Sequence, residues 1–239
     1  MMIRPQKQKL SGFSLIELLT AMTITSILML GLFSLVGQSS TNYRLSQRKV
    51  TTLSDTRAFL HYFQSDLTSR VADTKFFYQS NPTGDSIAFM RSNSIDEIST
   101  TGDLTASIYY IAFTADGRKG ESPKLFRRSL NPEQTQLLIK AGLTAAFPTT
   151  DPTVDEVVLY NVVAFRINAQ QRNAAGTMTA WLPTSNNAPS LLELTLEITD
   201  DLSAQRLLTT AAWTALATST IPQQREAVKR FVHNIPLTP

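Results

Sequence analysis

An apolar run near the N-terminus limits what this chain can fold into. Residues 13–36 are apolar or small and carry a single charge, Glu17. As a helix rising about 1.5 Å per residue, this run extends about 36 Å, which is enough to cross a hydrocarbon core of about 30 Å. The preceding residues include Arg4, Lys7 and Lys9 and no acid, a flank that places the N-terminus in the cytoplasm.

A signal peptide and an ordinary membrane anchor are the plain alternatives for such a run. The signal peptide fits poorly, because the run is too long and the small residues Ser11 and Gly12 lie before it. An ordinary anchor leaves Glu17 unexplained, since a carboxylate inside a bilayer costs about 3 kcal/mol even on insertion scales. An acid in this position needs a partner and suggests a function.

The stretch Gly12-Phe13-Ser14-Leu15-Ile16-Glu17 resembles the leader of type IV prepilins and type II secretion pseudopilins. The resemblance implies that a prepilin peptidase cuts between Gly12 and Phe13. It also implies that the amine of Phe13 is methylated and that Glu17 becomes the fifth residue of the mature chain. A neighbouring subunit's terminal ammonium could then neutralise Glu17, because each charge alone is expensive inside the membrane. The implied partners are other pilin-like subunits, the prepilin peptidase and a membrane crossed once.

Composition excludes several other kinds of protein. The formal net charge of +3 falls to 0 when residues 1–12 are removed, so no nucleic-acid partner is predicted. The absence of cysteine excludes a lipoprotein acyl site, disulfides and thiolate metal sites. No cofactor is expected.

A long helix is predicted to continue beyond the apolar run. There is no proline between Pro5 and Pro82 and no glycine between Gly37 and Gly84, so one helix is expected from Phe13 to about Val71. A seven-residue repeat with added three- and four-residue spacings marks one side of its second half: Val50, Leu53, Leu60, Phe63, Leu67 and Val71. A coiled coil is the alternative, but three heptads are few, and packing within the chain is favoured.

Beyond residue 84 the hydrophobic period changes from helical to two. Strands are predicted at Ser86–Met90, Ser107–Phe113 and Lys124–Leu130, with a hairpin loop at 116–120 between the last two. A short helix should follow, with Asn131 as N-cap, Pro132 at its first position and Gly142 at its end.

The clearest strands come later in the chain. Glu156–Ala169 is predicted as one strand whose shared face carries Val157, Leu159, Val163, Phe165 and Ile167. Leu191–Thr199 has the alternation of a half-buried antiparallel strand, with Leu192, Leu194, Leu196 and Ile198 inward. A long polar loop over 170–190 would join them. Asp200-Asp201 is predicted as a turn, Arg206–Trp213 as a last strand or a helix, and Pro222–His233 as a short terminal helix.

These elements predict an α+β fold in which a long N-terminal helix, half membrane-embedded and half amphipathic, packs on an antiparallel β-sheet domain. The expected boundaries are a leader at 1–12, a transmembrane or filament-core helix at 13–36 and a periplasmic domain at 37–239. The order of elements again resembles pilin-like proteins and is closest to the minor pseudopilin J or the minor pilin W. The similarity rests on IYYIAF with KLFRRSL, on VVLYNVVAFRI followed by Trp181, and on LLELTLEIT.

No motif in the sequence indicates catalysis. His61 and His233 are the only histidines, and HExxH, GxSxG and glycine-rich phosphate loops are absent, so no enzyme activity is expected. Calcium at Asp151, Asp155 and Glu156, or at Asp96 and Glu97, is a weaker interpretation than solvated loops, and the metal content stays open. Five aromatic residues could form a contact surface or a core: Tyr109, Tyr110, Tyr160, Trp181 and Trp213.

The sequence therefore favours a minor pilin-like subunit of a type II secretion or type IV pilus-like filament. The size of its domain, large beside the compact major subunits that the resemblance implies, favours a place at or near the tip. The competing hypothesis is a membrane-anchored periplasmic enzyme or binding domain that carries a pilin-type leader. The secretion or pilus system, its cargo and the partner subunits stay open.

Overall fold

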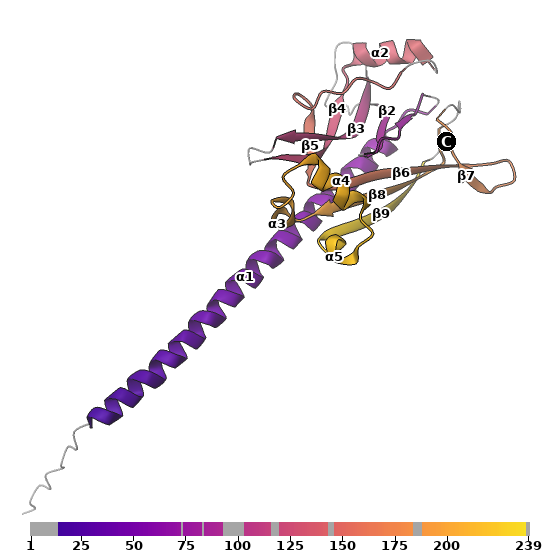
Figure 1. The fold of residues 1–239 in the computed structure, drawn as a ribbon. Coiled ribbons are helices and arrows are strands. Elements are labelled where there is room, and N and C mark those ends of the chain that lie inside the picture. The colour runs from indigo at the N-terminus through magenta and orange to yellow at the C-terminus, as the bar shows by residue number, and fades with distance from the viewer. Residues whose placement is uncertain are drawn as a thin grey trace, which may run out of the picture. The chain divides into compact units, whose positions relative to one another are not determined.

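The computed structural model describes residues 14–72, 74–82, 84–92, 103–115, 120–142, 146–183 and 188–237 (Figure 1). The chain divides into two compact units, Met1–Lys49 and Val50–Pro239. Helix α1, Leu15–Thr68, begins in the first unit and ends in the second. The predicted long helix is confirmed over these residues, while its expected first residue, Phe13, lies outside the described ones.

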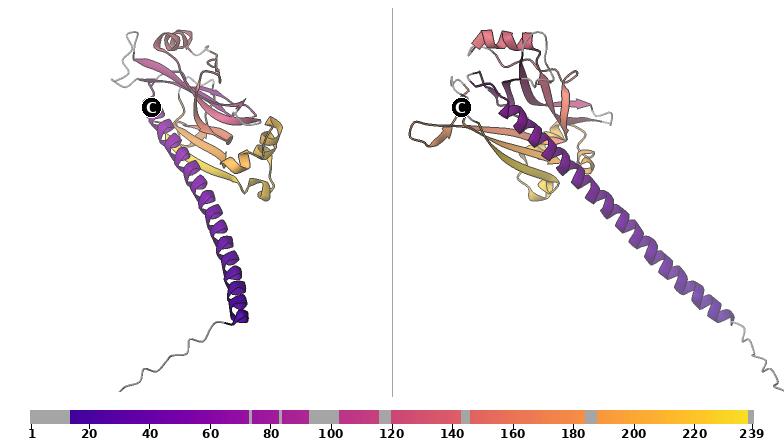
Figure 2. Two further views of the ribbon diagram at one scale, coloured as in Figure 1. Left: turned by 90° about the vertical axis from the view of Figure 1, so that its left-hand side faces the viewer. Right: turned by 180° about the vertical axis from the view of Figure 1, so that it is seen from behind.

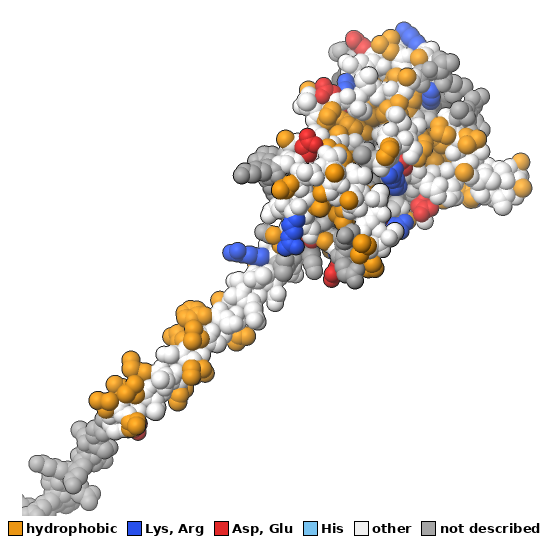
Figure 3. Space-filling model, in the orientation of Figure 1, with side chains coloured by type: hydrophobic (Ala, Val, Ile, Leu, Met, Phe, Trp, Pro, Cys, Tyr) orange, Lys and Arg blue, Asp and Glu red, His pale blue; other side chains and the backbone are white. Residues whose placement is uncertain are grey.

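In the first unit, the apolar part of α1 has no partner. Every described side chain from Ser14 to Val36 is exposed, and Figure 3 shows hydrophobic side chains following one another along this part of the helix. Four of its hydroxyl groups bond back to carbonyl oxygens three or four residues earlier, as Thr20 does to Ile16 and Glu17 at 3.0 Å each. Thr23, Thr25 and Ser26 do the same. The helix therefore satisfies these polar groups itself, as lipid requires.

The second unit contains two antiparallel sheets. The first has the order β1-β2-β3-β4-β5 and consists of β1 (Phe77–Gln79), β2 (Ser86–Ser92), β3 (Leu104–Ala115), β4 (Glu121–Ser129) and β5 (Glu156–Tyr160). The second has the order β7-β6-β8-β9 and consists of β6 (Val162–Arg172), β7 (Met178–Ala180), β8 (Leu191–Thr199) and β9 (Val228–Pro236). The three strands predicted in the first sheet are confirmed. The predicted hairpin joins β3 to β4, with Ala115 opposite Glu121, although loop residues 116–119 are not described.

The main core forms where the second half of α1 meets both sheets. Phe59, Phe63 and Leu67 are at most 3% exposed and belong to one cluster with residues of β2, β3, β4, β5, β6, β8 and β9. The Phe63 ring lies edge-on to Tyr109 at 4.9 Å between centroids and to Phe165 at 6.2 Å. The heptad side of α1 thus packs within the chain, as favoured. Val50 is 63% exposed, so this packing does not extend to the start of the predicted stripe.

The other face of the first sheet packs beneath helix α2, Pro132–Ala141. Its apolar cluster includes Met90, Ile108 and Phe126, with Leu138 of α2 against it, and both views in Figure 2 show α2 beside this sheet. The predicted caps are confirmed: Asn131 accepts from the Gln134 N–H in a capping box, Pro132 is at the first position, and Gly142 ends the helix with φ 57°.

The predicted strand Glu156–Ala169 is wrong as one element, because the chain changes sheets at Asn161. Asn161 has φ 57°, a conformation that asparagine tolerates better than branched residues, and it separates β5 from β6. A bulge between Val162 and Ala164 then turns Val163 toward Trp213, whereas Phe165 joins the α1 core. The five residues expected on one face are therefore divided among three clusters.

The C-terminal region also differs from expectation. Pro222–His233 is not a helix: a single turn, α5 (Pro222–Arg225), leads into β9. Pairing with β8 along the whole strand outweighs helical periodicity, and the β-branched residues Val228, Val232 and Ile235 suit a strand. Asp200-Asp201 is more than a turn, because Asp200 caps the short helix α3 (Asp201–Ala204). The segment Arg206–Trp213, predicted as a strand or a helix, leads into helix α4 (Thr210–Thr218). The loop expected over 170–190 contains the hairpin of β6 and β7.

Most of the aromatic candidates belong to the core. Tyr109, Tyr110, Trp181 and Trp213 are at most 5% exposed, and only Tyr160, at 54%, presents its ring to solvent. Trp213 of α4 donates its indole N–H to the Glu121 carbonyl at 3.1 Å, which fixes this helix against β4. The five residues thus do not form one contact surface.

Candidate functional site

The acid singled out in the apolar run, Glu17, lies in the first turn of α1. Ser14 precedes the helix, and its backbone N–H donates to Glu17 Oε2 at 3.4 Å. In return, the Glu17 N–H donates to Ser14 Oγ at 3.3 Å. This reciprocal pair is a capping box, which satisfies N–H groups that a helix start leaves unbonded. The Ser-x-x-Glu spacing in the sequence is the local signal for this capping box.

The capping box accounts for only part of Glu17. The Ser14 hydroxyl also lies 3.5 Å from Oε2, while Oε1 has no partner among the residues that the structure describes. The negative charge at a helix N-terminus is favourable, but no described cation faces it. Gly12 and Phe13, the predicted cleavage and methylation positions, lie outside the described residues.

The helix that carries Glu17 has the properties of a membrane span by length and composition. The segment Leu15–Arg44 contains an 18-residue window with a mean hydropathy of 2.0, and none of that window is buried within the chain. A side-chain surface this apolar would be unfavourable in water at about 25 cal/mol per Å². It therefore needs lipid or other helices around it.

Comparison with known proteins points to the same stretch. Residues 7–33 match the prokaryotic N-terminal methylation motif, which includes Gly12, Phe13 and Glu17. No match was found among curated proteins. Among solved structures, a type IV-like pilin from Thermus thermophilus is similar, with 11% sequence identity and a TM-score of 0.41 over 77% of this chain and 95% of that chain.

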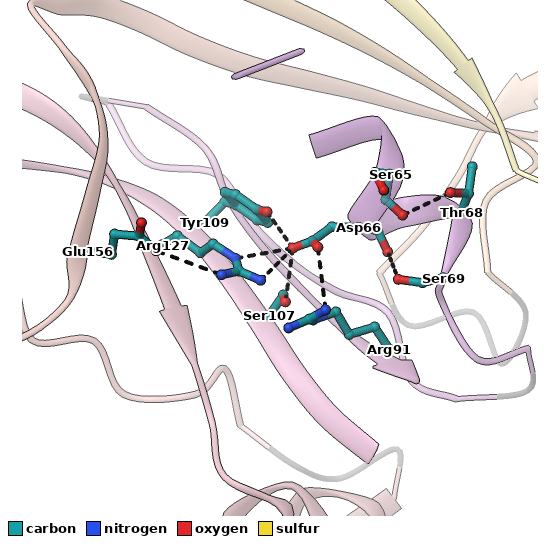
Figure 4. A network of polar contacts seen from close by, with 9 residues as sticks. All are labelled: Ser65, Asp66, Thr68, Ser69, Arg91, Ser107, Tyr109, Arg127 and Glu156. Atoms are coloured by element: carbon teal, nitrogen blue, oxygen red, sulfur yellow. Dashed lines mark hydrogen bonds and ion pairs between the residues drawn. The ribbon is translucent and has the colours of Figure 1, made fainter. Parts of the chain in front are cut away.

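A second cluster of chemistry-bearing residues lies around Asp66 near the end of α1 (Figure 4). Asp66 is 5% exposed, and its Oδ2 accepts from the Tyr109 hydroxyl at 2.6 Å and the Ser107 hydroxyl at 3.2 Å. Arg127 reaches the same oxygen with Nε and Nη2, both at 3.1 Å. Arg91 Nη1 lies 3.7 Å from Oδ1.

These contacts make the Asp66 cluster a junction between α1 and the first sheet. Burial raises the pKa of Tyr109, and the adjacent Asp66 charge raises it further, so the phenol stays protonated and donates. Arg127 also lies over the Tyr62 ring of α1, 4.8 Å from its centroid. The charges are matched within the chain, and the arrangement supports structure rather than proton transfer. Neither Asp66 nor Arg127 was predicted from the sequence as a site residue.

A similar junction links the two sheets. Asp85, 2% exposed just before β2, accepts from the Ile167 N–H of β6 at 2.7 Å and from Arg166 Nη1 at 3.2 Å. Arg166 also donates to the carbonyl oxygens of Asn81 and Pro82. This pair ties the turn before β2 to the middle of β6.

The weaker site candidates have local roles. Asp155 accepts from the Tyr110 hydroxyl at 2.7 Å and pairs with Arg128 at 3.8 Å. Hydrogen bonds from the Thr153 hydroxyl and N–H lower the pKa of Asp151, as expected of plain turn chemistry. No cluster of at least three metal-ligating side chains occurs among the described residues, which do not include Asp96 and Glu97.

No described hydrogen bond joins the two histidines to each other. His61 is exposed on α1, and His233 Nε2 lies 3.1 Å from Gln64 Oε1. Neither contacts the Asp66 or Asp85 cluster through any described bond.

Proposed function

We propose that this chain is a pilin-like subunit of a cell-envelope filament and that it acts by assembly rather than catalysis. The observation that carries the proposal is the methylation motif at residues 7–33, which leads into a helix whose side chains are all exposed through Val36. A leader peptide at 1–12 would be removed by prepilin peptidase, and the helix would first span the inner membrane once. The domain would lie in the periplasm, joined to other pilin-like subunits through the N-terminal helix.

A minor position near the tip of a type II secretion or type IV pilus-like filament is the more specific form of this proposal. It is supported by the size of the second unit, Val50–Pro239, which contains two sheets and is large beside the compact major subunits that the resemblance implies. The likeness to the minor pseudopilin J or minor pilin W type rests on the segments that form β3 with β4, β5 with β6, and β8.

Glu17 would provide the specific contact in assembly. Helices in lipid gain little from apolar contact alone, so a charge pair inside the bilayer can determine which helices associate. The Phe13 ammonium of a neighbouring subunit would take the carboxylate oxygen that has no described partner. An unpaired buried charge would cost several kcal/mol, roughly 3–5, which is enough to select the paired arrangement.

The capping box makes it possible to separate two roles of Glu17 experimentally. Glu17→Gln keeps an acceptor for the Ser14 N–H but removes the charge, whereas Glu17→Ala removes both. Both variants should be expressed, processed and inserted into the membrane. Both should lose co-purification with other pilin-like subunits and filament-dependent export or piliation, while Glu17→Asp should be intermediate.

The outcomes distinguish the proposed roles. If Glu17→Gln assembles like wild type while Glu17→Ala does not, helix capping rather than the charge pair is the role of Glu17. If both variants assemble like wild type, the pairing mechanism is wrong. Ser14→Ala is the matched control, since it removes the capping hydroxyl but leaves the carboxylate, and it should assemble.

A further inference from the structure

The edge of the second sheet formed by β9 differs from the other sheet edges that the structure describes. β1 and β7 have three residues each, and β5 has five with an irregular register against β4. β9 has nine residues in an unbroken register with β8, from Val228 opposite Thr199 to Pro236 opposite Leu191. Soluble proteins usually shorten, bulge or cover their edges, because a free strand edge pairs with other chains. In the part of the chain that the structure describes, β9 is neither shortened nor bulged, and its protections are its charges and its final proline.

The two faces of β9 are unlike. Phe231 and Ile235 pack into the core that contains α1, and His233 contacts Gln64 of α1 at 3.1 Å. Arg230, Val232 and Asn234 alternate with them and are exposed, Val232 by 51%. One face is therefore anchored by the core while the outer edge stays accessible. An added strand would find a rigid template, as recognition by strand addition requires.

The charges on β9 indicate what would bind there. Lys229 and Arg230 are both exposed, and neither forms an ion pair with any residue that the structure describes. Glu197 lies opposite Arg230 on β8, but its carboxylate pairs with Arg225 instead. The edge thus presents two basic side chains that no described acid neutralises.

We propose that the outer edge of β9 pairs with an extended, acidic strand of another pilin-like subunit. The proposal rests on the proposed function, which supplies neighbouring subunits at high local concentration. Backbone hydrogen bonds would provide the affinity, and acidic side chains facing Lys229 and Arg230 would provide selectivity. A second copy of this chain fits less well. β9 itself contains no acid, so antiparallel pairing with a second copy would give Lys229 and Arg230 no acidic partner along the paired strand.

Site-specific photo-crosslinking in the native host tests this proposal on the full chain. A crosslinking residue at Val232 should capture a different protein that carries an N-terminal prepilin-type motif, identified by mass spectrometry. Leu137 of α2 is the matched control, because it is apolar and 66% exposed but not on an edge, and it should capture no such protein. The edge proposal is wrong if Val232 gives no adduct, or if Val232 and Leu137 capture the same protein. It is also wrong if Val232 captures a second copy of this chain or a protein without a prepilin-type motif.

A charge reversal adds an independent measurement. Lys229→Glu with Arg230→Glu should reduce the Val232 adduct about tenfold, since rim charges govern association. Lys140→Glu, an exposed basic residue at the end of α2, should leave its yield unchanged. An undiminished yield in the double variant would overturn the acidic character assigned to the partner.

A third crosslinking position separates this proposal from the proposed function. Leu28 lies in the exposed part of α1, where filament neighbours are expected. If Leu28 captures a pilin-like subunit and Val232 does not, the filament role stands and the edge proposal falls. If neither position does so, both fall.

Discussion

Replacing Asp66 by alanine should strongly destabilise the second unit. The carboxylate is the common acceptor for Tyr109, Ser107 and Arg127, and it is only 5% exposed. Without it, the Arg127 guanidinium remains buried, with Glu156 Oε2 at 3.7 Å as its nearest described acid. Glu156 is largely solvent-exposed and is a poor replacement, because an exposed carboxylate is screened by water.

The expected size of the effect follows from the contacts. Removing one partner of a buried ion pair costs about 3–5 kcal/mol, because the remaining charge stays desolvated. Each hydroxyl left without an acceptor would cost about 1–3 kcal/mol, but the relief of burying Asp66 itself offsets part of this. We expect a net loss of about 4 kcal/mol in the free energy of unfolding. In a domain of this size, that loss lowers Tm by about 8–16 °C.

Urea denaturation of residues 38–239, followed by far-ultraviolet circular dichroism, measures this loss. Asp55→Ala is the control, because Asp55 is an exposed acid on the same helix, and its effect should stay within about 0.5 kcal/mol. In a double-mutant cycle, Asp66→Asn and Arg127→Met should couple by at least about 1 kcal/mol. If Asp66→Ala costs less than about 1 kcal/mol, or the cycle shows no coupling, the cluster does not fasten α1 to the sheet.

The remaining predictions concern maturation, pH and the isolated domain. Gly12→Val should leave an unprocessed membrane-bound precursor, and an intact mass of the wild-type protein that does not begin at Phe13 contradicts the cleavage site. Burial and the hydrogen bond to Asp155 raise the pKa of Tyr110 above 10.0, so the folded chain holds this proton longer than the unfolded one, and stability falls as pH rises above about 10. In Tyr110→Phe, the free energy of unfolding should fall with pH less steeply than in wild type, by up to about 1.4 kcal/mol per pH unit. Equal slopes in the two proteins would contradict the raised pKa of Tyr110. Residues 38–239 should form a soluble domain with strand content, and a disordered circular dichroism spectrum would contradict this.

Local signals predicted the parts of the fold whose partners lie close in sequence. Asn131, Pro132 and Gly142 predicted the two ends of α2, and all three act as expected. β8 needed only its own alternation, and its four inward residues are each at most 1% exposed. In both elements, the residues that determine the structure lie within a few positions of one another in the sequence.

Elements set by distant pairing were harder to predict. Ala227, Val228, Phe231 and Val232 have helical spacing, but β8 offers a complete partner strand, and the segment becomes β9. The break at Asn161 is equally nonlocal. Its left-handed backbone is stabilised by the sheets on either side, and its side chain donates to Asp201 at 2.8 Å, 40 residues away. The hydrophobic alternation continues through Asn161, so it does not indicate that the chain changes sheets there.

The two acids that matter most on α1 show how far sequence periodicity reaches. Asp66 follows Phe63 by three residues and Phe59 by seven, so helical spacing already places it on the buried side. A buried acid requires a cation, but nothing local indicates Arg127, which lies 61 residues away. Glu17 in the apolar run also requires a cation, but among the described residues only Ser14 bonds to its carboxylate. The described residues thus give Asp66 two arginines and two hydroxyl donors, whereas they leave one oxygen of Glu17 without a partner. We expect that partner to be a terminal amine, and a neighbouring subunit is the source that the assembly experiment tests.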